Sequence, residues 1–321
     1  MCDRLSWAGV DVLSDLLDRA RASNALVRQL VQPPPWAVTY ADPPPLTVLT
    51  TLGGPASIRL DDAGAAPVWL AAGDIALVKG PGQHTIADDP STPPRFVIHG
   101  GRKHFVDGGK VATQRTLAPR TYGDGLPGAT IMLRGAYELR GDVGDRLLEM
   151  LPPLAVVPAG PRIQAALDLL AAEVAHDEPG QDAVLYRLLD LVLVLALRAW
   201  CARPEAASPA WHRALTDPAI GDALRLLHED LAHRWTVGAL AAKVGMSRAA
   251  FAARFTSLVG QPPLTYLTDW RMTLAADLLR DTEATVATVA RDVGYADAFA
   301  FSVAFKRARG VSPSIWRRET R

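Results

Sequence analysis

The C-terminal third of the chain contains an internal repeat, and this repeat limits the possible folds more than any other feature. The segment that begins at Thr236 aligns with the segment that begins at Thr285. The matched positions lie 49 or 50 residues apart: Ala241, Val244, Gly245, Phe251, Phe255, Gly260, Pro263 and Tyr266 against Ala290, Val293, Gly294, Phe301, Phe305, Gly310, Pro313 and Trp316. Each copy predicts a short helix, a glycine turn and a longer helix.

Two helices and a turn cannot bury a core alone, so the two copies must share one. We expect a bridging helix over Leu264–Leu279, whose large apolar side chains are available to both copies. Ser247 and Asp297 are expected to cap the second helix of each copy, because short polar side chains accept hydrogen bonds from free backbone amides. The sequence thus predicts an all-α domain with two helix-turn-helix units.

The second helix of the second copy, over Ala298–Arg309, has an unusual outward face. At 100° per residue, one side of this helix forms an ordinary core stripe of Phe301, Ala304, Phe305 and Ala308. The opposite side carries two apolar residues among polar and basic ones: Phe299, Ser302, Val303, Lys306 and Arg307. Exposed aromatic side chains are costly unless a partner covers them. Either another molecule covers Phe299, or Phe299 packs on the neighbouring unit.

The first two thirds of the chain have a different pattern. From Leu46 to about Leu139, many short apolar or alternating runs lie between Gly, Pro and Asp turns, which is typical of a β-sandwich or barrel. We expect a helix over residues 3–30 before these strands, and two helices over 162–176 and 182–200 after them. The last helix is apolar nearly all round, so it is either a core helix or a dimer-forming helix.

These patterns divide the chain into two domains. Residues 1–200 form the first, residues 201–213 a polar linker, and residues 214–321 the second. Asp217 is the expected N-cap of the second domain's first helix, and Pro218 its first helical residue.

The charge of the chain is zero overall but unevenly distributed. From Pro218 onward, 14 Lys and Arg stand against 10 Asp and Glu, a balance of +4, which leaves −4 for residues 1–217. A basic C-terminal part indicates a polyanionic partner for that part alone. The two cysteines, Cys2 and Cys201, lie far apart and predict no disulfide framework. The most apolar run has only seven uninterrupted residues, too few to cross a bilayer, so we expect a cytoplasmic protein without a membrane partner.

Three stretches of the C-terminal third resemble a known family. LAAKVGMSRAAFAARF, VGQPPLTYLTDWRMTLAADLL and VARDVGYADAFAFSVAFKRARGVSPSIWRR are similar to the DNA-binding domain of AraC/XylS-type transcriptional regulators. Residues 1–200 more loosely resemble the cupin-type sensor domain of one subgroup, through APVWLAAGDIALVKGPGQHTIADDP and DEPGQDAVLYRLLDLVLVLALRAW. The resemblance implies an α+β multidomain protein: an N-terminal cupin-like β-barrel with trailing helices, then an all-α domain. It also implies double-stranded DNA and RNA polymerase as partners, a homodimer, and an unknown small-molecule effector.

In this family the outward face of each second helix meets base edges in a major groove. The resemblance therefore implies that the DNA-binding residues are Ser247, Arg248, Ala249, Ala252, Ala253, Arg254, Thr256, Asp297, Ala298, Phe299, Ser302, Val303, Lys306 and Arg307. The family usually has an arginine or another hydrogen-bonding residue where Ala253 and Val303 stand here. Few bidentate base contacts are then expected, and specificity would rest on Arg248, methyl contacts and DNA shape.

A cupin-like barrel can hold a ligand or a metal. Trp36, Trp69, His84 and Tyr122 are the candidate ligand residues, each with a core or rim position as the alternative. No metal site is expected, because His84 has no second histidine two residues on and the pair His99 and His104 flanks a turn-like segment.

Motifs of catalytic nucleophiles, zinc proteases, phosphate loops and dinucleotide sites are absent from the sequence. We therefore expect a non-enzymatic regulator with no catalytic residue and no cofactor. Two alternatives stay open: a ligand-independent regulator with a vestigial barrel, or a cupin enzyme fused to a helical domain.

Overall fold

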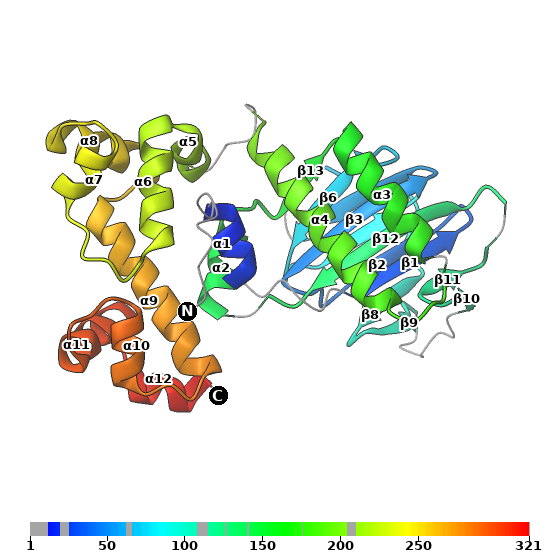
Figure 1. The fold of residues 1–321 in the computed structure, drawn as a ribbon. Coiled ribbons are helices and arrows are strands. Elements are labelled where there is room, and N and C mark those ends of the chain that lie inside the picture. Colours follow the sequence, from blue (N-terminus) through cyan, green and yellow to red (C-terminus); the bar gives the residue numbers. More distant parts are fainter. Residues whose placement is uncertain are drawn as a thin grey trace. The chain divides into compact units, whose positions relative to one another are not determined.

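The computed structural model describes residues 12–19, 26–61, 66–107, 115–125, 127–139, 141–174, 176–203 and 210–320 (Figure 1). These residues form two compact units. One holds all strands of the described chain with helices α3 and α4; the other holds α1 (Val12–Arg19), residues 141–147, and helices α5 to α12. The division expected from the sequence, at a single linker over 201–213, differs from this arrangement, because two segments from the first part of the chain belong with the C-terminal helices.

The first unit contains two β-sheets. The strand order is β10-β11-β1-β12-β3-β6-β13 in one sheet and β5-β4-β7-β2-β8-β9 in the other. Strands pair antiparallel except for the parallel pairs β1–β11 and β2–β8. The strand bounds are β1 Leu26–Gln32, β2 Ala37–Tyr40, β3 Leu46–Gly53, β4 Ala56–Leu60, β5 Val68–Leu70, β6 Ile75–Lys79, β7 His84–Ala87, β8 Phe96–His99, β9 Arg102–Phe105, β10 Thr116–Ala118, β11 Thr121–Gly123, β12 Thr130–Tyr137 and β13 Leu154–Val157.

The core of this unit draws side chains from both sheets. Val78 and Met132 come from the seven-stranded sheet and Val38 and Ile58 from the six-stranded one, and all four are buried. Because successive side chains of a strand point to opposite faces, each sheet places one set inward. The region between the two sheets is therefore the part of the unit in which a small molecule could be enclosed.

Helices α3 (Pro161–Val174) and α4 (Gln181–Cys201) pack together against the seven-stranded sheet (Figure 1). Gly135 of β12 allows the close approach of α4, since a Cβ at this position would lie 2.4 Å from the Leu189 side chain. Leu189 and Leu193 are buried. This face of α4 is therefore core, one of the two interpretations that the sequence left open for the helix.

The expected helix over residues 3–30 is wrong at its C-terminal end. Residues 26–30 lie in β1, which pairs with β12 along its whole length, so sheet pairing overrides the local helical pattern. Residues 3–11 and 20–25 lie outside the described ranges. The sequence also did not predict strands β2, β9, β10 and β13 or helices α2 (Gly141–Glu149), α5 (Ala210–Thr216) and α12 (Pro313–Thr320). The helix that begins at Pro218 is therefore not the first of its domain, because α5 precedes it and begins inside the expected linker.

The second unit contains the repeated helices. Asp217, Ser247 and Asp297 accept hydrogen bonds from backbone amides in the first turns of α6, α8 and α11, so all three expected N-caps are confirmed. Gly245 and Gly294 adopt φ angles of 68° and 85° in the two turns, a conformation that other residues adopt only with strain. The bounds are α5 Ala210–Thr216, α6 Pro218–Glu229, α7 Val237–Lys243, α8 Arg248–Val259, α9 Pro263–Asp281, α10 Val286–Asp292, α11 Ala298–Arg309 and α12 Pro313–Thr320.

Two segments from the first part of the chain complete this unit. The buried His228 of α6 is hydrogen-bonded through Nδ1 to Asp15 of α1 and through Nε2 to Tyr266 of α9, each at 2.8 Å. Asp277 of α9 accepts hydrogen bonds from two backbone amides at the start of α2, and Arg309 of α11 forms an ion pair with Asp142. No helix in the described ranges is long and apolar enough to cross a membrane.

Candidate nucleic-acid interface and barrel cavity

Helix α11 presents an apolar and basic outer face. Phe301 and Phe305 are fully buried, whereas Phe299 is 80% exposed and Val303 is 56% exposed. An exposed fraction of 80% does not fit the alternative in which Phe299 packs on the neighbouring unit. Ala308, which the sequence placed in the core stripe, is exposed, because the last turn of the helix extends beyond the core.

The remaining predicted residues of α11 divide by role. Lys306 and Arg307 are exposed, and in the described part of the chain neither forms an ion pair. Asp297 caps the helix by accepting a hydrogen bond from the Ala300 amide at 2.8 Å. Ser302 donates to the Ala298 carbonyl at 2.7 Å, so its hydroxyl is engaged within the helix. The face open to a partner therefore consists of Phe299, Val303 and the two cations.

Helix α8 presents a smaller and more polar face. Arg248, Ala249, Ala253 and Thr256 are exposed and Ala252 is half-buried. Ser247 accepts a hydrogen bond from the Ala250 amide at 3.3 Å. Arg248 has no ion-pair partner within the described ranges, so its guanidinium is available to a ligand.

Arg254 differs from the other predicted contact residues because it has a partner within the unit. Its guanidinium donates to one carboxylate oxygen of Asp217 from Nε at 2.8 Å and from an Nη at 2.5 Å. No sequence pattern indicates this pair, which joins residues 37 positions apart. DNA contact by Arg254 stays a prediction, but the observed contact is structural.

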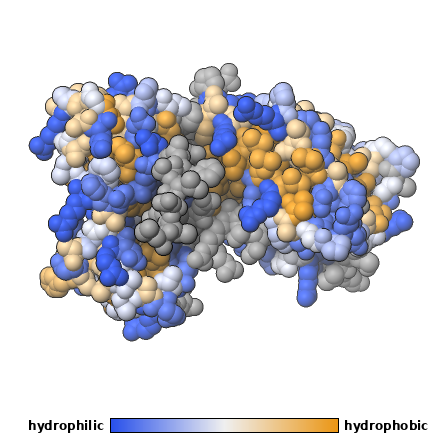
Figure 2. Space-filling view, viewed as in Figure 1, coloured by the Kyte–Doolittle hydropathy of each residue, from blue (hydrophilic) through white to orange (hydrophobic). Residues whose placement is uncertain are grey.

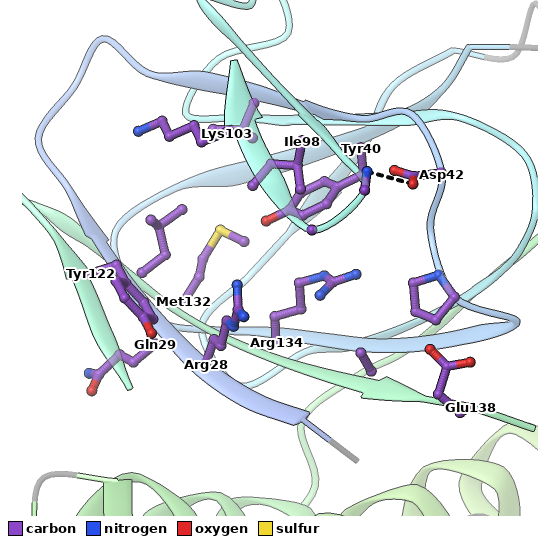
Figure 3. A pocket seen from close by; sticks show the side chains of 16 residues that line it. Arg28, Gln29, Tyr40, Asp42, Ile98, Lys103, Tyr122, Met132, Arg134 and Glu138 are labelled. Carbon is purple, nitrogen blue, oxygen red and sulfur yellow. Dashed lines mark hydrogen bonds between the residues drawn. The ribbon is translucent and has the colours of Figure 1, made fainter. Parts of the chain in front are cut away.

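A cavity of about 330 Å³ lies in the sheet unit (Figure 3). Its lining combines apolar and charged side chains from both sheets: Arg28, Gln29, Leu30, Val38, Tyr40, Asp42, Pro44, Ile98, Gly100, Gly101, Lys103, Tyr122, Met132, Arg134, Ala136 and Glu138. This volume is at the lower end of the range for small-molecule sites.

Of the four predicted ligand residues, Tyr122 lines this cavity and the other three do not. Trp36 is buried in the core and donates through its indole to Thr130 Oγ1 at 3.2 Å. Trp69 is 53% exposed on β5. His84 is buried and stacks on Tyr40, with ring centroids 5.2 Å apart. The sequence analysis missed the arginines and Tyr40. Arg28 and Arg134 are brought together by the pairing of β1 with β12, and Tyr40 lies on β2, a strand that the sequence did not predict.

The electrostatics of the cavity centre on Arg134. Burial and, next, the positive charge of Arg134 lower the pKa of His84 to about 4, so this histidine is neutral at pH 7. Burial lowers the pKa of Arg134 itself. The guanidinium lies over the Tyr40 ring at 4.6 Å from its centroid, which offsets part of the desolvation of the charge.

Apolar side chains also gather on the outside of the sheet unit. Figure 2 shows hydrophobic side chains over α3 and α4. Leu169 of α3 is 59% exposed, and Val184 and Leu191 of α4 are each 44% exposed. Val184 and Leu191 are seven residues apart and therefore lie on the same side of the helix.

Comparisons with known proteins give a consistent picture. Residues 11–202 match the family described as "Cupin", and residues 240–319 match the family described as "Helix-turn-helix domain". A protein of Streptomyces lividans named "Putative AraC-like transcription regulator" is 34% identical over 96% of this chain and 98% of its own. The "HTH-type transcriptional regulator AlkR" of Acinetobacter baylyi is 27% identical over 97% of this chain and 100% of its own. Among solved structures, the DNA-binding domain of AdpA in complex with a target DNA is 34% identical and covers 32% of this chain and 93% of that chain, with a TM-score of 0.31.

Proposed function

The chain belongs to the AraC-type transcription regulators, which are DNA-binding proteins, and from this premise we propose that α8 and α11 read the operator while a small molecule in the barrel controls binding. The observation that carries the proposal is the outer face of α11. An exposed phenylalanine and valine are followed by two cations that form no ion pair with the described residues. This arrangement fits a major groove, where apolar side chains contact thymine methyl groups and cations contact phosphates.

Control by a small molecule is supported by the cavity between the sheets. It combines an apolar lining with a few charged groups, which is typical of ligand sites. The alternative of a vestigial barrel predicts that the cavity serves no ligand and that DNA binding is constitutive.

Self-association is supported by the exposed leucines and valine on α3 and α4. We infer that a second copy of the chain covers them, because exposed apolar groups in a cluster mark an interaction surface. RNA polymerase is the further partner expected for a regulator of this family.

The test of DNA recognition is selection of double-stranded DNA from a random pool by the purified full-length protein, followed by sequencing. Two units reading successive grooves should enrich sequences with two conserved segments about one helical turn apart. Lys306→Ala should weaken binding to all sequences alike and make the salt slope shallower by about one unit. A protein that enriches no sequence would contradict the proposal.

A further inference from the structure

Two arginines stand directly opposite each other on the inner face of the seven-stranded sheet. Arg28 of β1 and Arg134 of β12 are register partners in an antiparallel pair. Both line the cavity, and Figure 3 shows their side chains side by side at its floor. Like charges in directly opposed positions destabilise a sheet, so this pair is a cost to the empty protein.

Nothing in the described chain neutralises the two charges. Neither side chain forms a hydrogen bond or an ion pair with the described residues, and Arg134 Nε is buried without a partner. Their contacts are aromatic: Arg134 lies over Tyr40, and Arg28 lies 5.6 Å from the centroid of Tyr122. The rings hold the guanidinium groups in place, and no acceptor among the described residues takes their N–H donors.

The carboxylates of the cavity do not take these donors. Asp42 accepts a hydrogen bond from the Gly100 amide at 2.7 Å and lies 3.7 Å from His99 Nδ1. Glu138 is exposed, and neither acid forms an ion pair with Arg28 or Arg134. A planar guanidinium pair with free donors matches the oxygens of a carboxylate or phosphate group.

The next positions along the same two strands are apolar. Leu30 and Met132, two residues along each strand from the arginines, are register partners and also line the cavity. From the other sheet, Ile98 and Val38 line it. An anionic group held at the arginines would therefore have an apolar surface beside it.

We propose that the cavity binds a small organic anion whose carboxylate or phosphate group contacts Arg28 and Arg134. The rest of the molecule is apolar, about the size of an aromatic ring system, and packs on Leu30, Met132, Tyr40 and Tyr122. This inference rests on the proposed control by a small molecule, and it names the chemical class of that molecule. Binding relieves the repulsion between the two arginines, so the filled barrel is more stable than the empty one.

The test uses the full-length protein and measures binding by calorimetry and by the thermal midpoint at constant ionic strength. The probes are 2-naphthoate, 2-naphthyl phosphate, the neutral 2-naphthamide and inorganic phosphate. We expect at least one aromatic anion to bind and to raise the midpoint, with the amide and inorganic phosphate about tenfold or more weaker. The two aromatic anions distinguish a carboxylate site from a phosphate site.

Variants separate this role from a structural one. Arg134→Met and Arg28→Met should lower the affinity for the aromatic anion about tenfold or more and should raise the midpoint of the empty protein. Arg59→Met on β4, whose guanidinium contacts Asp61 at 3.4 Å, is the control and should leave the affinity unchanged. Either of two results would overturn the inference: no binding of either aromatic anion to the wild type, or an affinity that is unchanged in both cavity variants.

DNA binding is measured on the same samples. If the wild type selects a DNA sequence but binds neither aromatic anion, the inference fails and the DNA-binding function stands. If an aromatic anion binds and no DNA sequence is selected, the inference stands and the proposed function fails.

Discussion

The carboxylate of Asp217 caps helix α6 and also accepts two hydrogen bonds from Arg254 of α8. The pair therefore connects the start of α6 with the second helix of the first helix-turn-helix unit. Arg254 holds α8 in place through this contact, and any role that it has toward DNA is additional.

Replacing Arg254 should affect stability more than recognition. Arg254→Ala leaves Asp217 with its capping role only, and because the pair is partly exposed the cost should be about 1 kcal/mol of unfolding free energy or less. Arg248→Ala is the matched variant, because Arg248 is exposed and forms no ion pair in the described chain. The variant protein should keep the thermal midpoint of the wild type and lose affinity for the selected DNA. Thermal unfolding and DNA titration of both variants check the prediction. It would be contradicted if Arg254→Ala lost only DNA affinity and Arg248→Ala lost only stability.

Phe299 and Phe301 form a second matched pair. Phe299→Ala should leave the thermal midpoint nearly unchanged and weaken specific DNA binding by about 1–3 kcal/mol, comparable with one lost base contact, while non-specific binding barely changes. Phe301→Ala removes a fully buried ring and should cost about 3–5 kcal/mol of folding stability. If Phe299→Ala melts several degrees lower and loses both kinds of binding, the outward-face interpretation is wrong.

Two leucines of α4, the exposed Leu191 and the buried Leu189, distinguish a subunit interface from the core. Leu191→Glu places a charge on an exposed position and should give a folded protein that elutes as a monomer if a second copy covers this surface. Leu189→Glu buries a charge against Gly135 and should prevent the sheet unit from folding. Size-exclusion chromatography with light scattering and circular dichroism distinguish the two; a dimeric Leu191→Glu variant would exclude this surface.

The buried His84 predicts a pH effect on the sheet unit. The pKa of this histidine is about 4 when folded and about 6.5 when unfolded, so between these values the unfolded chain binds more protons and stability is lost as pH falls. Burial raises the pKa of Asp190 to about 6, which acts in the opposite direction over the same range and masks the effect in the wild type.

His84→Phe isolates the histidine, because the ring can still stack on Tyr40 and Asp190 is unchanged. The stability of this variant relative to the wild type should increase by about 2 kcal/mol between about pH 7.5 and about pH 5. Denaturant unfolding at the two pH values measures the difference. An equal difference at both values would contradict a neutral, buried His84.

The sequence predicted the helical unit better than the sheet unit. The repeat, the glycine turns and the caps are local signals, and each of Asp217, Ser247 and Asp297 stands where its own helix begins. The short strands from β3 to β7 were also recognisable, because each lies between turn residues. Strand β1 was not, since its pairing with β12 joins residues about a hundred positions apart.

The same difference holds for the candidate sites. Phe299 and Val303 could be assigned to an outer face because helical periodicity alone gives the face. Arg28 and Arg134 could not be placed opposite each other from the sequence, because their pairing depends on the register of two distant strands. The contact of Arg309 with Asp142 could not be predicted either, because it joins α11 to a segment that no sequence pattern marked as a helix.

The interleaving of the chain has a consequence for recombination between related genes. Helix α6 needs Asp15 for its buried histidine, and α9 and α11 need the start of α2, so the helical unit is encoded in three separated parts of the gene. A crossover between codons 203 and 210 would leave two of these parts behind. New operator specificity should therefore arise in this lineage by substitution on α8 and α11 more readily than by exchange of the C-terminal third, and a designed chimera should carry its own α1 and the start of its own α2.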